Sequence, residues 1–260
     1  MNLTENEKHN LELVWRGMGA ILETKDAPVV EQTFAPDFIQ HNPWAQDGIA
    51  HVKEMLDFDF GYRAVRWVTE GDTMAYLGYY TAPNPLGENP LYCADMWRIA
   101  EGQIAEHWDA LVPIPPDQLG KVLAGPGNGE APVDRADVAR NKATVTTFLD
   151  HVYNRGETGR IPELVAPGYV YHHPSAGEQT GHTALLDQLA QQPGGRMPHD
   201  RKRLVASGDL VMSYAHYFGE ADRVTFDWFR LDNEHRIAEH WSISQPLVPL
   251  TEAANAHPHF

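Results

Sequence analysis

The pentapeptide IAEHW occurs twice in the chain, at residues 104–108 and again at residues 237–241. The first copy continues with Asp109 and the second with Ser242, so these two residues hold the same position relative to the repeat. Copies about 130 residues apart are too distant for a solenoid, whose period is roughly 20 to 50 residues. The spacing instead predicts two similar domains in one chain.

The match extends beyond the pentapeptide in the same order along both halves. FAPDFIQHNP at residues 34–43 aligns with VAPGYVYHHP at 165–174, and VTEGDTMAYLGYY at 68–80 aligns with VASGDLVMSYAHY at 205–217. The stretch from Pro113 to Asp137 is dense in Pro, Gly and charged residues, as linkers are. We therefore predict domains over residues 1–116 and 137–250, a linker over 117–136, and a loose tail over 251–260 whose His257 and His259 are solvated.

Composition narrows the class of protein. The 260 residues are 42% hydrophobic and 22% charged, as in globular proteins, and the formal net charge is −16. This charge disfavours nucleic acid and anionic membranes as partners. The sequence begins without a basic, apolar leader and contains no long apolar run, so we expect a cytoplasmic location. The single cysteine, Cys93, excludes an internal disulfide framework and a cysteine-based zinc cage.

Hydrophobic periodicity changes in the same order within each half. Residues 7–23 carry apolar side chains at helical spacing, and residues 145–153 do the same in the second half. Short helical stretches follow, and four strand-like runs then come at residues 64–69, 73–81, 92–99 and 104–112, separated by turn residues. Helices followed by an antiparallel meander predict an α+β domain in which a curved sheet wraps around helices.

This order, together with the segments F-x-x-Q-H-N-P, G-D-x-x-x-x-x-x-Y, D-x-W-R-I and I-x-E-H-W-D, resembles the NTF2-like superfamily. Within it the sequence is most similar to the SnoaL-like polyketide cyclase group. The resemblance implies two cone-shaped barrels in tandem, each with a mostly apolar pocket at its open end. Because the superfamily includes cyclases, isomerases, dehydratases, epoxide hydrolases and non-catalytic binding or scaffold domains, the fold alone does not determine the function.

Asp109 is the first candidate catalytic residue. Alternation along residues 104–112 places His107 and Asp109 on one face of a strand, with Glu106 and Trp108 on the other. If the first face lines an apolar pocket, burial raises the pKa of Asp109 and makes it a stronger base toward a C–H acid. The resemblance implies the same role, since SnoaL-like cyclases use an aspartate on the last strand to start an aldol condensation. The alternative is an aspartate at a strand edge, bonded to a turn.

The serine in the second copy distinguishes the two halves. A neutral hydroxyl without an adjacent base cannot replace a carboxylate, so we expect chemistry in the first domain and a supporting or separate binding role for the second. The counterparts of the candidate site in the second domain are His172, His173, Asp227, His240 and Ser242.

Two further candidates accompany Asp109 and His107. His41 lies in a segment leaving a short helix, where its ring can reach the pocket mouth as a hydrogen-bond donor or cap a loop instead. Asp95 lies in an otherwise apolar strand, where a carboxylate is costly unless it is paired, and His107 is a cross-strand partner that it can tune. Arg98 is not expected to pair with Asp95, since residues three apart in a strand face opposite sides.

Other side chains are expected to shape the pocket or the core. The predicted substrate-binding residues are Phe38, Asn42, Trp44, Trp67, Tyr76 and Trp97. Trp108 and Trp241 are expected at a core or an interface, because NTF2-like domains commonly pair through their sheets. The two repeats are therefore expected to form an internal pseudo-dimer, with further homo-oligomerisation as an option.

These features favour a cofactor-independent acid/base enzyme acting on a small apolar carbonyl compound, by aldol cyclisation, isomerisation or dehydration. An epoxide or ester hydrolase using the same carboxylate is one alternative, and a non-catalytic small-molecule-binding or scaffold protein is another. A metal site built from His41, His107, Asp95 and Asp109 is the less favoured interpretation, since no H-x-x-x-H or H-E-x-x-H helix is present. We expect no metal and no organic cofactor.

Overall fold

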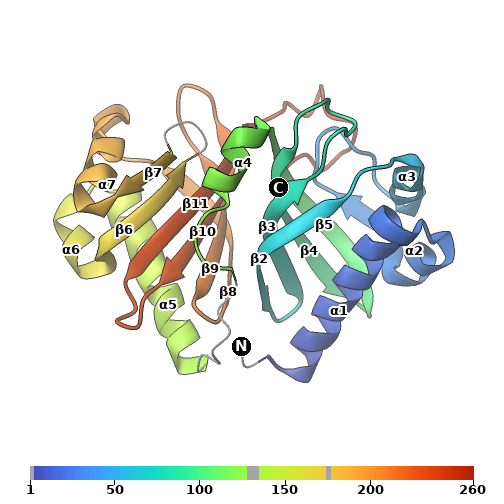
Figure 1. Ribbon diagram of the computed structural model, residues 1–260, viewed down its shortest axis with the longest axis horizontal. Helices are drawn as coiled ribbons and strands as arrows, with labels where there is room; N and C mark the ends of the chain where they lie inside the picture. Colours follow the sequence, from blue (N-terminus) through green and yellow to red (C-terminus); the bar gives the residue numbers. More distant parts are fainter. Residues whose placement is uncertain (1–2, 128–134, 174–176) are drawn as a thin grey trace. The chain divides into compact units, whose positions relative to one another are not determined.

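The computed structural model describes residues 3–127, 135–173 and 177–260, which form two compact units. Residues 3–115 and 247–260 make up the first domain, and residues 116–246 belong to the second domain. Each contains helices packed on a curved sheet (Figure 1). The predicted α+β class with two similar domains is confirmed, although the sheets are curved rather than closed.

In the first domain, the long helix α1 (Glu5–Gly19) opens with a capping box. Thr4 Oγ1 accepts a hydrogen bond from the Glu7 amide, and Glu7 Oε2 accepts one from the Thr4 amide at 2.7 Å. The helix continues as a π-helical turn, η1 (Ala20–Thr24), a device common at functional sites. The shorter helices are α2 (Ala27–Thr33), α3 (Ile49–Glu54) and the 3₁₀ turn η2 (Met55–Asp57).

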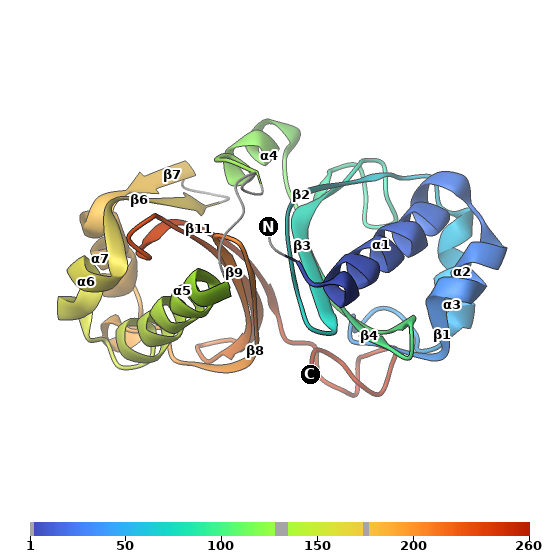
Figure 2. The ribbon, with the colours of Figure 1, turned by 90° about the horizontal axis from the view of Figure 1, so that it is seen from below.

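The sheet of the first domain has the strand order β1-β5-β4-β3-β2 and curves around α1 (Figure 2). Its strands are β1 (Phe34–Gln40), β2 (Tyr62–Glu70), β3 (Thr73–Tyr80), β4 (Leu91–Ala100) and β5 (Gln103–Pro113). Strand β1 runs parallel to β5, whereas the other neighbours are antiparallel. The predicted antiparallel meander is confirmed for β2 to β5, and the residues expected only to leave a short helix form an additional strand, β1.

Gly78 marks a close approach between two strands. A Cβ atom at this position would lie 2.0 Å from the carbonyl oxygen of Arg63, so only glycine fits. The pairing of β2 with β3 shifts register between Ala64 and Arg66, next to this contact. Such irregularities increase strand twist, which helps a sheet to curve around a helix.

The second domain repeats the pattern. Its helical elements are α4 (Pro116–Val122), α5 (Arg135–Thr147), η3 (Phe148–Tyr153), η4 (Thr158–Arg160), α6 (Ile161–Leu164), α7 (Gly181–Ala190) and η5 (Pro193–Gly195). Its strands are β6 (Val165–His173), β7 (Gly177–Thr180), β8 (His199–Ser207), β9 (Leu210–Tyr217), β10 (Arg223–Leu231) and β11 (Ile237–Pro246). They assemble in the order β7-β6-β11-β10-β9-β8, again with one parallel pair, β6 and β11. Among the described residues, none of the helices has the length and apolar character needed to cross a membrane.

Two connecting segments are more ordered than the sequence suggests. The stretch predicted as a linker contains α4, and the carbonyl oxygen of Ala124 accepts a hydrogen bond from the Trp241 indole at 3.0 Å. The expectation of a loose tail with solvated histidines is wrong for His259, which is 3% exposed. The tail packs on the first domain because its main-chain and side-chain polar groups find partners there.

Candidate active site

A cavity of about 340 Å³ opens in the first domain between the helices and the concave face of the sheet. Small-molecule sites commonly measure roughly 300 to 1,000 Å³. The walls are mainly apolar. Four polar side chains, Gln40, Asn42, His107 and Asp109, come from β1, the segment after it, and β5, while α3 adds His51 and β3 adds Tyr80. Apolar residues that line the cavity include Met18, Ile21, Leu22, Phe34, Phe38, Val52, Met55, Phe60, Leu91, Trp97 and Leu111.

Most of the predicted substrate-binding residues line this cavity, namely Phe38, Asn42, Trp44 and Trp97. Two do not. Tyr76 is fully buried and donates its hydroxyl to Tyr80 at 2.9 Å, while Trp67 packs against the apolar core from a half-buried position. Both support the wall of the cavity and do not form its lining.

Asp109 lies on the cavity side of β5, as strand alternation predicts, and is 7% exposed. Its Oδ2 accepts a hydrogen bond from Asn42 Nδ2 at 2.8 Å, and among the described residues no partner binds its other oxygen. Burial raises the pKa of Asp109 to about 6, and the nearby Asp95 adds to this rise, whereas His107 and the Asn42 hydrogen bond oppose it. A carboxylate with this pKa is a base suited to neutral pH.

His107 is held by a hydrogen-bond arrangement that fixes its protons. The main-chain amide of Asn42 donates a hydrogen bond to the side-chain oxygen Oε1 of Gln40 at 2.9 Å, which identifies this atom as the oxygen and not the nitrogen of the side chain. The same oxygen lies 3.0 Å from His107 Nδ1. Nδ1 must therefore carry a proton. Nε2 faces Asp95 Oδ1 at 3.1 Å, an atom that already accepts the Tyr80 hydroxyl. One more proton consequently lies between the imidazole and Asp95.

The electrostatics place this second proton on His107. Burial by itself lowers the pKa of His107, but the hydrogen bond and charge of Asp95 and the charge of Asp109 outweigh it and raise the pKa above its ordinary value. Asp95 is fully buried and does not line the cavity. It contacts His107 across the strands, which is the pairing that the sequence predicts.

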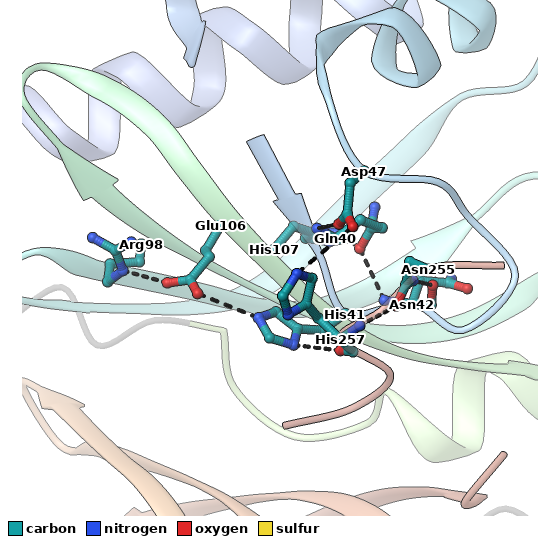
Figure 3. A network of polar contacts seen from close by, with 9 residues as sticks. All are labelled: Gln40, His41, Asn42, Asp47, Arg98, Glu106, His107, Asn255 and His257. Atoms are coloured by element: carbon teal, nitrogen blue, oxygen red, sulfur yellow. Dashed lines mark hydrogen bonds and ion pairs between the residues drawn. The ribbon is translucent and has the colours of Figure 1, made fainter. Parts of the chain in front are cut away.

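His41 is not part of the cavity lining, and its ring lies between Glu106 and His257 (Figure 3). Its ring stacks on Trp108 with centroids 4.5 Å apart, and its Nδ1 donates to the His257 carbonyl at 2.7 Å. The predicted pocket role of His41 is therefore wrong. The reason is that residues 34–40 form a strand, so alternation sends Phe38, Gln40 and Asn42 toward the cavity and His41 away from it.

The second domain keeps the buried histidine, aspartate and tyrosine of this arrangement. His240 Nε2 lies 2.8 Å from Asp227 Oδ1, and Tyr217 donates its hydroxyl to Asp227 Oδ2 at 2.6 Å. Burial acts to raise the pKa of Asp227, but the hydrogen bond and charge of His240 outweigh it and the pKa is lowered. Ser242 is paired opposite Asp227 in the register, where the first domain has Asp109 opposite Asp95.

Tyrosines surround the second histidine. His240 is 1% exposed and stacks between Tyr171 and Phe229, at centroid distances of 4.7 and 4.5 Å, while Tyr169 bonds its Nδ1. Tyr171 stands where the first domain has Gln40. His172, like His41, faces away and stacks on a tryptophan, Trp241, at 4.8 Å. The predicted role of the His173 side chain lies outside the described residues.

Two members of the site, Gln40 and Tyr80, were not predicted. The available signal was the repeat itself, because Tyr80 recurs as Tyr217 and both tyrosines donate to the buried aspartate of their domain. Gln40 has no such signal, since its counterpart is Tyr171.

Asp95, His107 and Asp109 each offer a possible metal ligand, and these atoms lie within 4.8 Å of one another. One imidazole and two carboxylates suit a divalent cation such as Zn²⁺. Binding would require His107 to release the proton on Nε2 and Asp95 to give up its hydrogen bond with it. His41, the fourth residue of the metal alternative, lies on the other face.

The sequence profile of the SnoaL-like domain matches residues 15–107 and 145–240, which is more than half of the chain. The chain belongs to the SnoaL-like domain family. The two matched segments of this tandem SnoaL-like protein end at His107 and His240, so the match does not include Asp109 or Ser242.

Solved structures with a similar fold each correspond to one part of the tandem SnoaL-like chain. A candidate ketosteroid isomerase of Kribbella flavida is 16% identical, with a TM-score of 0.39, over 44% of this chain and 83% of its own. IdmH of Streptomyces antibioticus, a candidate polyketide cyclase, is 22% identical, with a TM-score of 0.34, over 40% of this chain and 91% of its own. An LEH-like epoxide hydrolase of M. tuberculosis is 15% identical, with a TM-score of 0.36, over 42% of this chain and 85% of its own. No curated protein matches the chain.

Proposed function

We propose that the first domain is a cofactor-independent acid/base enzyme that removes a proton from carbon next to the carbonyl group of a small apolar substrate. The observation that carries this proposal is the position of Asp109, a buried carboxyl group in an apolar cavity, with a pKa of about 6. At neutral pH it is largely ionised, and the poorly hydrated carboxylate is a stronger base than one in water.

The steps follow from the hydrogen bonds. The Asp109 oxygen that Asn42 does not bind takes the proton, and the electrons of the broken C–H bond form an enolate on the substrate. His107, with its two protons held by Gln40 and Asp95, places a fixed positive charge beside this developing negative charge. Return of the proton from Asp109 to a different carbon gives isomerisation. Attack of the enolate on a second carbonyl, with this proton passing to the new alkoxide, gives aldol cyclisation, and departure of a β-hydroxyl with this proton, as water, gives dehydration.

The cavity lining supports a substrate with one polar end. Most of its polar groups come from β1, the segment after it, and β5, whereas α1, η1, η2 and β4 contribute apolar side chains. A charged or strongly polar molecule would lose its hydration against these apolar walls without compensation. This favours an apolar ketone or ester with its carbonyl group near Asp109.

Exchange of substrate protons with solvent tests the proposal whichever product the enzyme forms. The protein is incubated in D₂O with a panel of apolar cyclic ketones, β-keto esters and Δ5-3-ketosteroids, and deuterium incorporation is followed by NMR. We expect Asp109→Asn to lower the exchange rate of an accepted compound at least about 100-fold, the lower range for a lost general base. Ser242→Ala, the matched change in the second domain, should leave it unchanged. Equal rates in the two variants would refute the role of Asp109.

Apolar epoxides belong in the same panel, because an ionised Asp109 next to the Asn42 amide is also able to orient a water molecule. Diol formation without any proton exchange would assign the hydrolase alternative. The binding alternative predicts an exposed or salt-bridged Asp109, whereas the observed carboxyl group is buried and bonded to a neutral amide.

A further inference from the structure

The C-terminal tail, residues 247–260, is bound to the segment that carries Asn42. The Ala254 amide donates to the Pro43 carbonyl at 2.7 Å, and the His259 amide donates to the His41 carbonyl at 2.9 Å. These two main-chain bonds fix the tail along the segment directly after β1. The tail thus packs behind the part of the cavity wall that contains Asn42, Trp44 and Ala45, although it follows the second domain in the sequence.

Asn255 makes the most complete set of contacts in the tail. Its side-chain Nδ2 donates to the carbonyl oxygens of Asn42 and Ala45, at 2.6 and 2.8 Å, and its Oδ1 accepts from the His257 amide at 2.9 Å. The residue is only 9% exposed. A buried amide with all these groups satisfied holds one geometry, because each lost bond would leave a polar group desolvated and unpaired (Figure 3).

The bound segment leads directly to the proposed base. Asn42 donates through Nδ2 to Asp109, and its Oδ1 accepts from the Trp44 amide at 2.8 Å. Asn255 therefore holds the main chain of Asn42 and Ala45, while the Asn42 side chain contacts the carboxyl group. The connection from Asn255 to Asp109 passes through one residue.

The second domain shows what this tail replaces. There β7 pairs with the end of β6, including Val170 with Thr180 and Tyr171 with Gln179. The equivalent end of β1 has no corresponding hairpin strand among residues 3–115, and the carbonyl groups of His41 and Pro43 bond to the tail instead. The domain with the aspartate thus takes from the distant tail the support that the other domain obtains from its own β7.

From this arrangement we infer that Asn255 is a positioning residue of the active site, which sets the orientation of the Asp109 carboxyl group by fixing Asn42. This inference rests on the proposed function for its catalytic consequence. The tail then belongs to the proton-transfer machinery of the first domain. Substitutions in the tail that loosen Asn255 are therefore expected to affect Asp109.

The test is a titration of Asp109 in the full-length, unliganded protein, followed by carboxyl ¹³C NMR and assigned with Asp109→Asn. The hydrogen bond from Asn42 lowers the pKa of Asp109, so Asn42→Ala should raise it. Asn255→Ala should raise it as well. Since Asn255 acts through Asn42, the double variant should titrate together with Asn42→Ala. An unchanged or lowered pKa in Asn255→Ala, or a double variant that shifts beyond Asn42→Ala, would overturn the inference.

Amide exchange separates local loosening from unfolding. In Asn255→Ala we expect the Trp44 amide to exchange about tenfold faster, while the amides of β4 keep their protection. Asn255→Ser retains one donor and should fall between the wild type and the alanine variant, which covers the case of a poorly folded Asn255→Ala. Glu252→Ala, an exposed change in the same tail, is the matched control and should change neither measurement.

An activity measurement adds the catalytic consequence. With a ketone that shows exchange, Asn255→Ala should lower kcat about tenfold with a smaller effect on KM, since a misplaced base loses rate. If no compound is turned over, the proposed function fails. The titration still decides whether Asn255 positions Asn42. A failure of the proposed function is therefore distinguishable from a failure of the inference about Asn255.

Discussion

Asp95 and Asp109 lie directly opposite each other on the neighbouring strands β4 and β5, and the same two positions in the second domain hold Asp227 and Ser242. Two carboxyl groups placed side by side in a buried site repel each other when both are ionised. In the first domain His107, whose pKa is raised, lies close to both carboxyl groups, whereas the second domain has a serine at the second position. Burial first, and the charge of Asp95 in addition, raise the pKa of Asp109, so its ionised form costs stability.

We predict that Asp109 lowers stability at neutral pH. Its folded-state pKa, about 6, lies above the ordinary value of 3.8, so protonation stabilises the folded state and this contribution is lost as pH rises from about 4 through 6. One pKa unit corresponds to about 1.4 kcal/mol, so Asp109→Asn should be more stable than the wild type by up to about 3 kcal/mol at pH 8. Urea unfolding of both proteins between pH 4 and pH 8 measures this difference, which should vanish at the acid end.

The rate of proton exchange should depend on pH as a bell. The base must be ionised, so kcat/KM should rise with pH through about 6, and His107 must be protonated, so kcat/KM should fall at higher pH, above the ordinary imidazole range. Because the two groups interact, the pKa values read from the rising and falling sides of the profile describe the pair and not either residue alone. A rate that is constant between pH 5 and pH 9 would contradict the assignment.

Replacing Asp95 with Asn should move the whole profile to lower pH. Asp95 raises the pKa of His107 through its hydrogen bond and charge, and its charge also raises the pKa of Asp109, so both values should fall in Asp95→Asn. The imidazole ¹H NMR titration of His107 and the pH profile of kcat/KM measure the two shifts. Asp227→Asn, the equivalent change in the second domain, should leave both unchanged.

Removal of metal ions should leave the activity intact. His107 Nδ1 donates to Gln40 and its Nε2 shares a proton with Asp95, so a metal ion at Nε2 would have to displace this proton. Dialysis against EDTA should therefore not change the exchange rate, and the purified protein should contain less than one equivalent of Zn²⁺ by elemental analysis. Activity that is lost on dialysis and restored by Zn²⁺ would instead assign the Asp95, His107 and Asp109 cluster as a metal centre.

The sequence allowed prediction of those parts that depend on local periodicity. Alternation along residues 104–112 correctly placed His107 and Asp109 on one face, and the cost of burying Asp95 correctly suggested a partner across the strand. The repeat, together with the order of helices and strands, led to the tandem NTF2-like fold.

The misplaced residues depend on long-range pairing. Strand β1 contains Pro36 and pairs in parallel with β5, far along the chain, so no local hairpin signal marks it. Without that strand, the face of His41 could not be deduced. The tail binds through main-chain groups and one asparagine, and neither leaves a hydrophobic pattern.

The return of residues 247–260 to the first domain also affects how the protein is made. Ribosomes synthesise a chain from its N-terminus, so the first domain can begin to fold long before Asn255 has been translated. A nascent or prematurely terminated chain contains Asp109 but not the segment that secures Asn42.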